Sequence, residues 1–182
     1  MIEPTDDGAA VEEVSVVLRE AGQAVHLQKK VAIAAGRLDP RLRVEIRLEN
    51  RSERPLTVRV GLEWATTMLG GGGNPSAWRE VAGLRAGHDT SGDAAGIQQL
   101  GEGNDWLGVA IESSVEPAAD AWWAPIETVS NSEAGFERVY QGSALLLSWP
   151  IDLAPGKSWS ATVEQRVTID RDRADAPAAP GG

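Results

Sequence analysis

Apolar and polar residues alternate with a period of two through three segments of the chain, which is the pattern of half-buried antiparallel strands. The segments are residues 42–48, 56–64 and 159–169. Their alternate apolar positions, which we expect to face the core, are Leu42, Val44, Ile46, Leu48, Leu56, Val58, Val60, Leu62, Trp64, Trp159, Ala161, Val163, Val167 and Ile169. The run "ALLLSW" at 144–149 is apolar on both faces, so it predicts a central strand with Trp149 in the core.

The connections between these segments also favour strands joined by turns. "ENRSERP" at 49–55 has the composition of a hairpin loop, and "LAPGKS" at 153–158 is a tight turn with Pro and Gly. Shorter strand candidates occupy residues 14–18, 25–33 and 107–111. Many strands with turn-rich connections predict an all-β fold, an antiparallel β-sandwich.

The sequence predicts one sandwich domain over residues 13–170, between a flexible N-terminal tail at 1–12 and a disordered C-terminal tail at 171–182. Residues 69–105 are rich in glycine and show little periodicity. We expect this segment to be an irregular insertion that is functional, mobile or a covering flap.

Composition narrows the classes of function. The chain has 182 residues, no cysteine and a net charge of −10, with its Lys and Arg scattered along the sequence. Binding to nucleic acid or to an anionic membrane requires a concentrated basic surface, so we expect neither partner. There is no apolar run long enough to span a bilayer and no secretory signal at the start. Together with the lack of cysteine, this fits a cytoplasmic protein.

The sequence offers little catalytic chemistry, and we predict no catalytic residue, no metal site and no cofactor. His26 and His88 are the only histidines, and they lack the close spacing of a zinc site. One histidine and one glutamate could serve as acid and base of a sugar epimerase, but only if the fold brings them together. We expect both histidines at the surface.

One segment, "WWAPIETVSNSEAGFERVYQGSALLLSWP" at 122–150, carries the residue types that recognise sugars. Aromatic rings pack on the C–H face of a pyranose, while carboxylates and amides bond its hydroxyls. The candidates are Trp122, Trp123, Glu127, Asn131, Glu133, Glu137, Tyr140 and Gln141. On a strand the two tryptophans point to opposite faces, and we expect the outward one to lie beside Glu133 or Glu137. The alternatives are a structural corner and a glycosidase carboxylate pair.

Residues 122–159 resemble the closing region of the C-terminal domain of family-57 glycoside hydrolases, of the α-amylase and 4-α-glucanotransferase type. The shared run is an aromatic followed by "PIETVS", "SEAGFE", "YQG", a Trp-Pro and a Pro-Gly turn. The resemblance implies a galactose-mutarotase-like sandwich (a supersandwich) of the kind that accompanies a catalytic barrel. The sequence lacks the strand–helix alternation of that barrel, so we expect no hydrolase or transferase activity from it.

Three functions follow as hypotheses. The first is a non-catalytic accessory or carbohydrate-binding domain that contacts α-glucan or another oligosaccharide. The second is a docking module for a separate glycosidase catalytic chain, which would expose an apolar patch of several hundred Å². The third, an aldose epimerase, is the least favoured because of the placement of the histidines.

Overall fold

The computed structural model describes residues 3–4, 9–20, 23–34, 36, 39–69, 72–132 and 135–170. Within them the strands form an 11-stranded antiparallel sheet in the order β1-β2-β3-β4-β11-β9-β8-β6-β7, with β10 pairing both β5 and β9. The strands are β1 (Glu3–Pro4), β2 (Ala9–Glu20), β3 (Gln23–Ala34), β4 (Arg41–Asn50), β5 (Leu56–Thr66), β6 (Ala77–Val81), β7 (Leu84–Gly87), β8 (Gly92–Asn104), β9 (Val109–Ser132), β10 (Gly135–Leu153) and β11 (Ser158–Ile169). The predicted all-β sandwich is confirmed.

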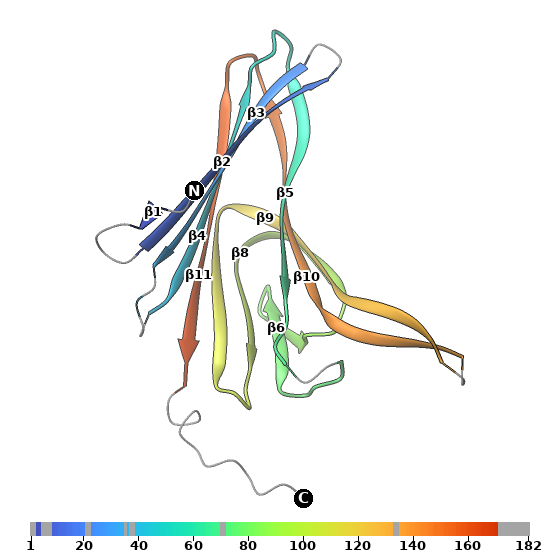
Figure 1. Cartoon of the computed structure of the whole chain (residues 1–182). Coiled ribbons are helices and arrows are strands. Elements are labelled where there is room, and N and C mark those ends of the chain that lie inside the picture. Colours follow the sequence, from blue (N-terminus) through green and yellow to red (C-terminus); the bar gives the residue numbers. More distant parts are fainter. Residues whose placement is uncertain are drawn as a thin grey trace, which may run out of the picture.

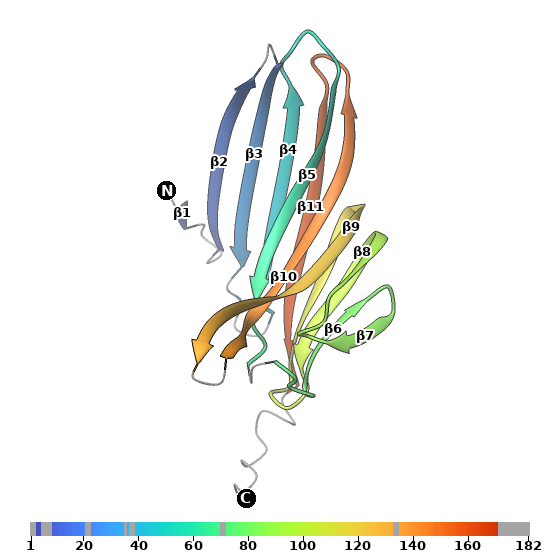
Figure 2. The same ribbon diagram turned by 90° about the vertical axis from the view of Figure 1, so that its right-hand side faces the viewer.

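The sheet becomes two layers because β8 and β9 pass from one layer into the other. The first half of β9, residues 109–116, pairs with β11, whereas residues 120–132 pair with β10. The change of partner falls next to the cis peptide bond between Glu116 and Pro117. Figures 1 and 2 show β5 and β10 lying across the layer formed by β4, β11 and the first half of β9.

The core lies between these layers and contains most of the alternate apolar positions that the sequence predicts. Val44 and Val163 face it from one layer, and Leu145, Leu147 and Trp149 face it from β10. Trp159 is half-buried, with its ring centroid 5.4 Å from that of Trp149. One predicted inward position is wrong: Ile169 is exposed, because it lies at the end of β11 beyond the covering strands.

The predicted irregular insertion at 69–105 is wrong for much of its length, since it contains β6, β7 and β8. Residues 77–81 alternate in burial like other strands, although the inward position 79 is an arginine. At the N-terminus, β1 and the start of β2 fall within the predicted tail of residues 1–12. The predicted C-terminal tail, 171–182, lies outside the described residues.

Candidate functional site

Trp122 and Trp123 point to opposite faces of β9, as the strand period requires. Trp123 packs against the hydrophobic core, while Trp122 is 49% exposed on the outward face. Trp122 is therefore the tryptophan of this pair that a ligand in solution can reach.

The cross-strand register decides which side chains surround Trp122. Asp93 of β8 pairs with Trp122 on one side and Leu146 of β10 on the other. Directly paired residues project to the same face with their Cβ atoms about 5 Å apart. Leu146 in turn pairs with Glu63 of β5. Asp93 and Glu63 are exposed, and neither makes a side-chain hydrogen bond to another described residue.

Asp120 adds a third carboxylate, because it lies two residues before Trp122 on the same face of β9. Its Oδ2 accepts a hydrogen bond of 2.9 Å from Nη1 of Arg59, and the same nitrogen donates to the Ser148 hydroxyl. This ion pair joins two exposed side chains and occupies one oxygen of Asp120. We call the group of Trp122, Asp93, Asp120 and Glu63 the Trp122 surface.

Trp123 depends on a glycine in the neighbouring strand. Gly92 pairs with Trp123, and a Cβ at Gly92 would overlap Cζ2 of the indole. We therefore expect Gly92→Ala to displace the ring and to lower the free energy of unfolding by about 1–3 kcal/mol, as overpacking does. Urea denaturation checks this, with Ser91→Ala at the exposed neighbouring position as the control. Equal stability of both variants would contradict the close packing.

The other predicted binding residues do not gather around Trp122. Glu137 pairs with Ser130, eight positions beyond Trp122 along β9 or roughly 26 Å away, so the expectation that it lies beside the outward tryptophan is wrong. Glu127 forms an ion pair with Arg138, and the remaining candidate Glu133 lies outside the described residues.

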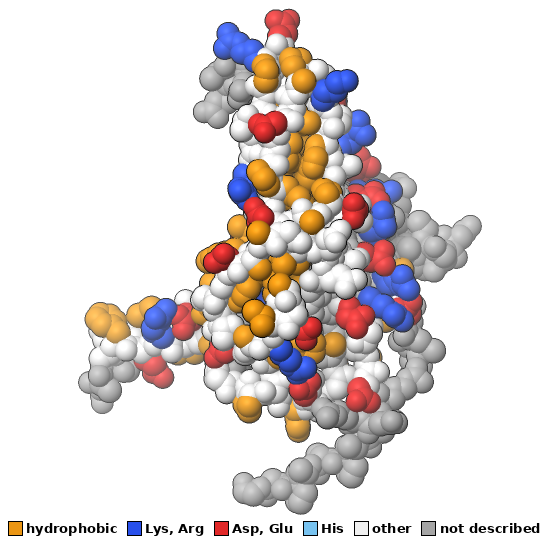
Figure 3. Space-filling view, turned by 180° about the vertical axis from the view of Figure 1, so that it is seen from behind, with side chains coloured by type: hydrophobic (Ala, Val, Ile, Leu, Met, Phe, Trp, Pro, Cys, Tyr) orange, Lys and Arg blue, Asp and Glu red, His pale blue; other side chains and the backbone are white. Residues whose placement is uncertain are grey.

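Glu127, Asn131 and Glu137 belong to a hairpin, formed by residues 126–132 and 135–140, that we call the arm. It extends away from the sandwich in Figure 1. Asn131 is exposed near its end, and the Gln141 amide at its base donates to Thr128 and to the Val139 carbonyl. Figure 3 shows hydrophobic side chains along the arm. Its exposed apolar residues are Ile126, Val129, Phe136 and Val139.

Tyr140 instead points toward a buried polar cluster centred on Glu102. Arg79 of β6 is 1% exposed and donates from Nε to Oε1 of Glu102 over 2.8 Å, and Nη2 contacts the same oxygen. His88 Nε2 lies 3.1 Å from that oxygen, and His88 Nδ1 lies 2.8 Å from the Tyr140 hydroxyl. The cluster joins β6, β8 and β10.

Charge and hydrogen bonding set the ionisation of this cluster. Burial alone would raise the pKa of Glu102, but the hydrogen bond to His88 and the charge and hydrogen bonds of Arg79 together lower it below its usual value. Burial raises the pKa of the Tyr140 hydroxyl. Glu102 is therefore a carboxylate at neutral pH, and it offsets the charge of Arg79 inside the protein.

The expectation that both histidines lie at the surface is wrong. His88 is buried beside Glu102, and His26 is buried between Ser15 and Arg51, with Nδ1 2.7 Å from Nη2 of Arg51. His88 and Glu102 do meet, as an epimerase would require. Both side chains are almost completely buried, however, so a substrate does not reach them in this structure.

Asp93, Asp120 and Glu63 could not be predicted as neighbours of Trp122, because nothing local in the sequence gives the register between strands. The buried pair of Arg79 and Glu102 was not predicted either. The alternation at 77–81 is one of burial and not of hydropathy, because the inward position 79 is an arginine, so no local signal in the sequence identifies β6.

Two structural findings limit the chemistry of the described part of the chain. Among the described residues, no three or more His, Cys, Asp or Glu side chains lie close enough together to hold a metal ion. None of its segments forms a helix long and apolar enough to cross a membrane.

Comparison with known proteins places the fold in a family. Residues 7–163 match the family described as alpha-amylase/4-alpha-glucanotransferase, C-terminal. The chain belongs to this family. "Alpha-amylase 1" of Dictyoglomus thermophilum is 45% identical over 73 residues, which are 37% of this chain and 10% of the relative. The chain thus spans a small part of the length of that relative.

Solved structures support the same architecture for this alpha-amylase/4-alpha-glucanotransferase C-terminal domain. The 4-alpha-glucanotransferase from Thermococcus litoralis matches with a TM-score of 0.58 and 19% identity, over 93% of this chain and 22% of the other. A galactose mutarotase-like protein from Clostridium acetobutylicum matches with a TM-score of 0.63 and 8% identity, over 93% and 65%. At these identities the likeness shows the fold alone, and it confirms the predicted galactose-mutarotase-like sandwich.

Proposed function

We propose that this chain is a non-catalytic accessory domain that binds α-glucan on the Trp122 surface. The observation that carries the proposal is the outward indole of Trp122 with Asp93 beside it and Asp120 on the same face. An exposed indole offers a flat apolar face for a pyranose ring, and the carboxylates accept hydrogen bonds from sugar hydroxyls.

The charge of the Trp122 surface supports a neutral ligand over an anionic one. Three of its four side chains are acidic, and the basic group beside them, Arg59, is paired with Asp120. A phosphate or sulfate group would be repelled by Asp93 and Glu63. A neutral sugar chain meets no such cost, and the family of the chain favours a glucan among neutral sugars.

We expect Trp122→Ala to weaken the binding of maltoheptaose at least tenfold and to remove the change in tryptophan fluorescence on binding. The free energy of unfolding should fall by less than about 1.5 kcal/mol, because the exposed indole loses little buried area. Isothermal titration and fluorescence measure the binding. Trp106→Ala is the matched control, since Trp106 is 72% exposed in the β8–β9 turn. Undiminished binding by Trp122→Ala, or none by the wild type at millimolar sugar, would refute the proposal.

The exposed apolar residues of the arm favour a second candidate, docking onto a separate glycosidase chain. Phe136 is 83% exposed and Val129 is also exposed, which is unusual for a projecting hairpin that has no partner. Size-exclusion chromatography with the catalytic chain tests this function. Docking predicts that Phe136→Ser abolishes co-elution and that Trp122→Ala preserves it, whereas elution of the wild type as a free domain would contradict it.

A further inference from the structure

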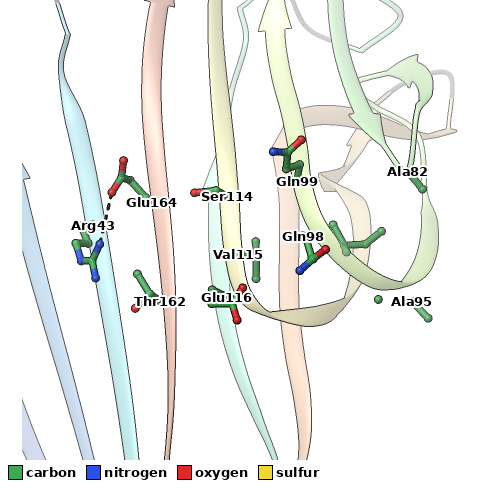
Figure 4. Close-up of a pocket in the computed structure, with 12 residues that line it drawn as sticks. Arg43, Ala82, Ala95, Gln98, Gln99, Ser114, Val115, Glu116, Thr162 and Glu164 are labelled. Carbon is green, nitrogen blue, oxygen red and sulfur yellow. Dashed lines mark ion pairs between the residues drawn. The ribbon is translucent and has the colours of Figure 1, made fainter.

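A groove runs along the outward face of the other layer, across β4, β11, β9 and β8. Its volume is about 920 Å³. A second hollow of about 500 Å³ continues it toward β6, and the two share Gln99, Ser114 and Glu164 in their walls. Figure 4 shows the polar side chains that line the larger hollow. None of the four residues of the Trp122 surface lines either hollow, so the groove is a separate site.

Breaks in the pairing of β8 with β9 form one wall of the groove. The register shifts between Ala94 and Ile97 and again between Ile97 and Gln99, and Gly96 has a φ of 68° at this point. As a result the consecutive residues Gln98 and Gln99 are both exposed and both line the groove, which regular alternation does not allow. Bulges of this kind re-aim side chains and are common next to functional sites.

The groove contains hydrogen-bonding groups that have no partner within the described residues. These are the amides of Gln98 and Gln99, the hydroxyls of Ser114 and Thr162, and the Glu116 carboxylate. On the opposite wall Glu164 is already held by two arginines, with 3.1 Å to Arg41 and 3.6 Å to Arg43. The unpaired groups that line the groove therefore include both hydrogen-bond donors and hydrogen-bond acceptors.

This mixture selects the chemistry of a ligand. A hydroxyl both donates and accepts, so a chain of sugar units can satisfy amides, hydroxyls and a carboxylate together. The free carboxylate of Glu116 disfavours an anion, and an apolar molecule would leave the amides unpaired. Trp78 at the far end offers no stacking face, because the Arg85 guanidinium lies 4.0 Å above its ring while Gly101 and Gly103 lie against it. Recognition in the groove thus rests on hydrogen bonds.

We propose that this groove is a second carbohydrate-binding site, which holds several successive units of a neutral oligosaccharide. The volume lies at the upper end of the range for small-molecule sites, about 300–1,000 Å³, and suits a chain better than a single sugar. The choice of α-glucan as the ligand rests on the proposed function, but the site itself does not depend on Trp122.

The test uses the full chain with Trp122→Ala as the background, so that binding at the Trp122 surface is removed. Adding maltose, maltotriose and maltoheptaose to labelled protein should shift backbone amide NMR signals at residues 96–99 and 112–116. Affinity should rise with the length of the sugar. In the same Trp122→Ala background, the double change Gln98→Ala and Gln99→Ala should weaken maltoheptaose binding at least tenfold. Both side chains are exposed and unpaired, so the melting temperature should be unchanged.

Gln28→Ala is the control, because Gln28 lies on β3, pairs with Arg47 of β4 and lines neither hollow. Loss of all sugar binding in Trp122→Ala protein, with binding present in the wild type, would overturn the groove while leaving the Trp122 surface intact. Unchanged binding by the Gln98/Gln99 variant, or NMR shifts confined to other residues, would also overturn the groove. A loss in the Gln98/Gln99 variant together with full binding by Trp122→Ala would support the groove and refute the Trp122 surface. No shift with any sugar in wild-type protein would overturn both.

Discussion

Glu102→Gln should lower the free energy of unfolding by about 3–5 kcal/mol, because it leaves the guanidinium of Arg79 buried without a counter-charge. Both side chains are 1% exposed, and Arg79 Nη1 has no hydrogen-bond partner among the described residues. The Glu102 carboxylate accepts from Nε and Nη2 of Arg79 and also from the Thr66 hydroxyl. The amide would keep the shape of the side chain and lose its charge. Urea denaturation at neutral pH measures the loss.

The effect of Glu102→Gln should also depend on pH. Since folding lowers the pKa of Glu102, its carboxylate adds stability above the unfolded value of about 4.3, and this contribution is lost as the pH falls through the folded value. The difference between wild type and Glu102→Gln should therefore shrink in acid. Glu112→Gln, an exposed change on β9, should cost less than about 0.5 kcal/mol at any pH.

A double change tests whether the charge pair causes the loss. Replacing both partners, as Arg79→Met with Glu102→Leu, removes both buried charges and should cost less than Glu102→Gln alone. A double-mutant cycle gives the coupling energy between the two positions. A loss under about 1 kcal/mol for Glu102→Gln would show that water reaches the cluster and screens Arg79.

The strands that the sequence predicts well are those with one buried face. In β4 and β5 the apolar period of two reports the fold directly, because each inward side chain meets the opposite layer. In β6 and β8 the hydropathy of the sequence does not show this period of two. Arg79 and Glu102 occupy inward positions and neutralise each other, and glycines fill positions beside the Trp78 ring. A polar pair inside a core has no signature in the hydropathy of either strand.

The candidate site also has one part that the sequence predicts and one part that it does not. The opposite orientations of Trp122 and Trp123 follow from local geometry alone, and the sequence predicts them. The neighbours of Trp122 follow from the register between β8, β9 and β10, which the break near Pro117 and the bulge between Tyr140 and Gly142 both alter. For this reason Asp93 lies beside Trp122 and Glu137 does not. Proximity along the chain was a poor guide to proximity across the sheet.

Trp149→Ala should lower the free energy of unfolding by about 3–5 kcal/mol, as truncation of a buried aromatic side chain does. The indole is buried in the core from β10, its ring packs on Trp159, and its Nε1 donates to the Pro117 carbonyl over 3.0 Å. The change would leave a cavity and an unpaired carbonyl at the point where β9 passes between layers. Trp106→Ala should cost less than about 0.5 kcal/mol. If Trp149→Ala cost under 1 kcal/mol, then β10 would not be the centre of the core, and the bend in β9 would hold without its tryptophan.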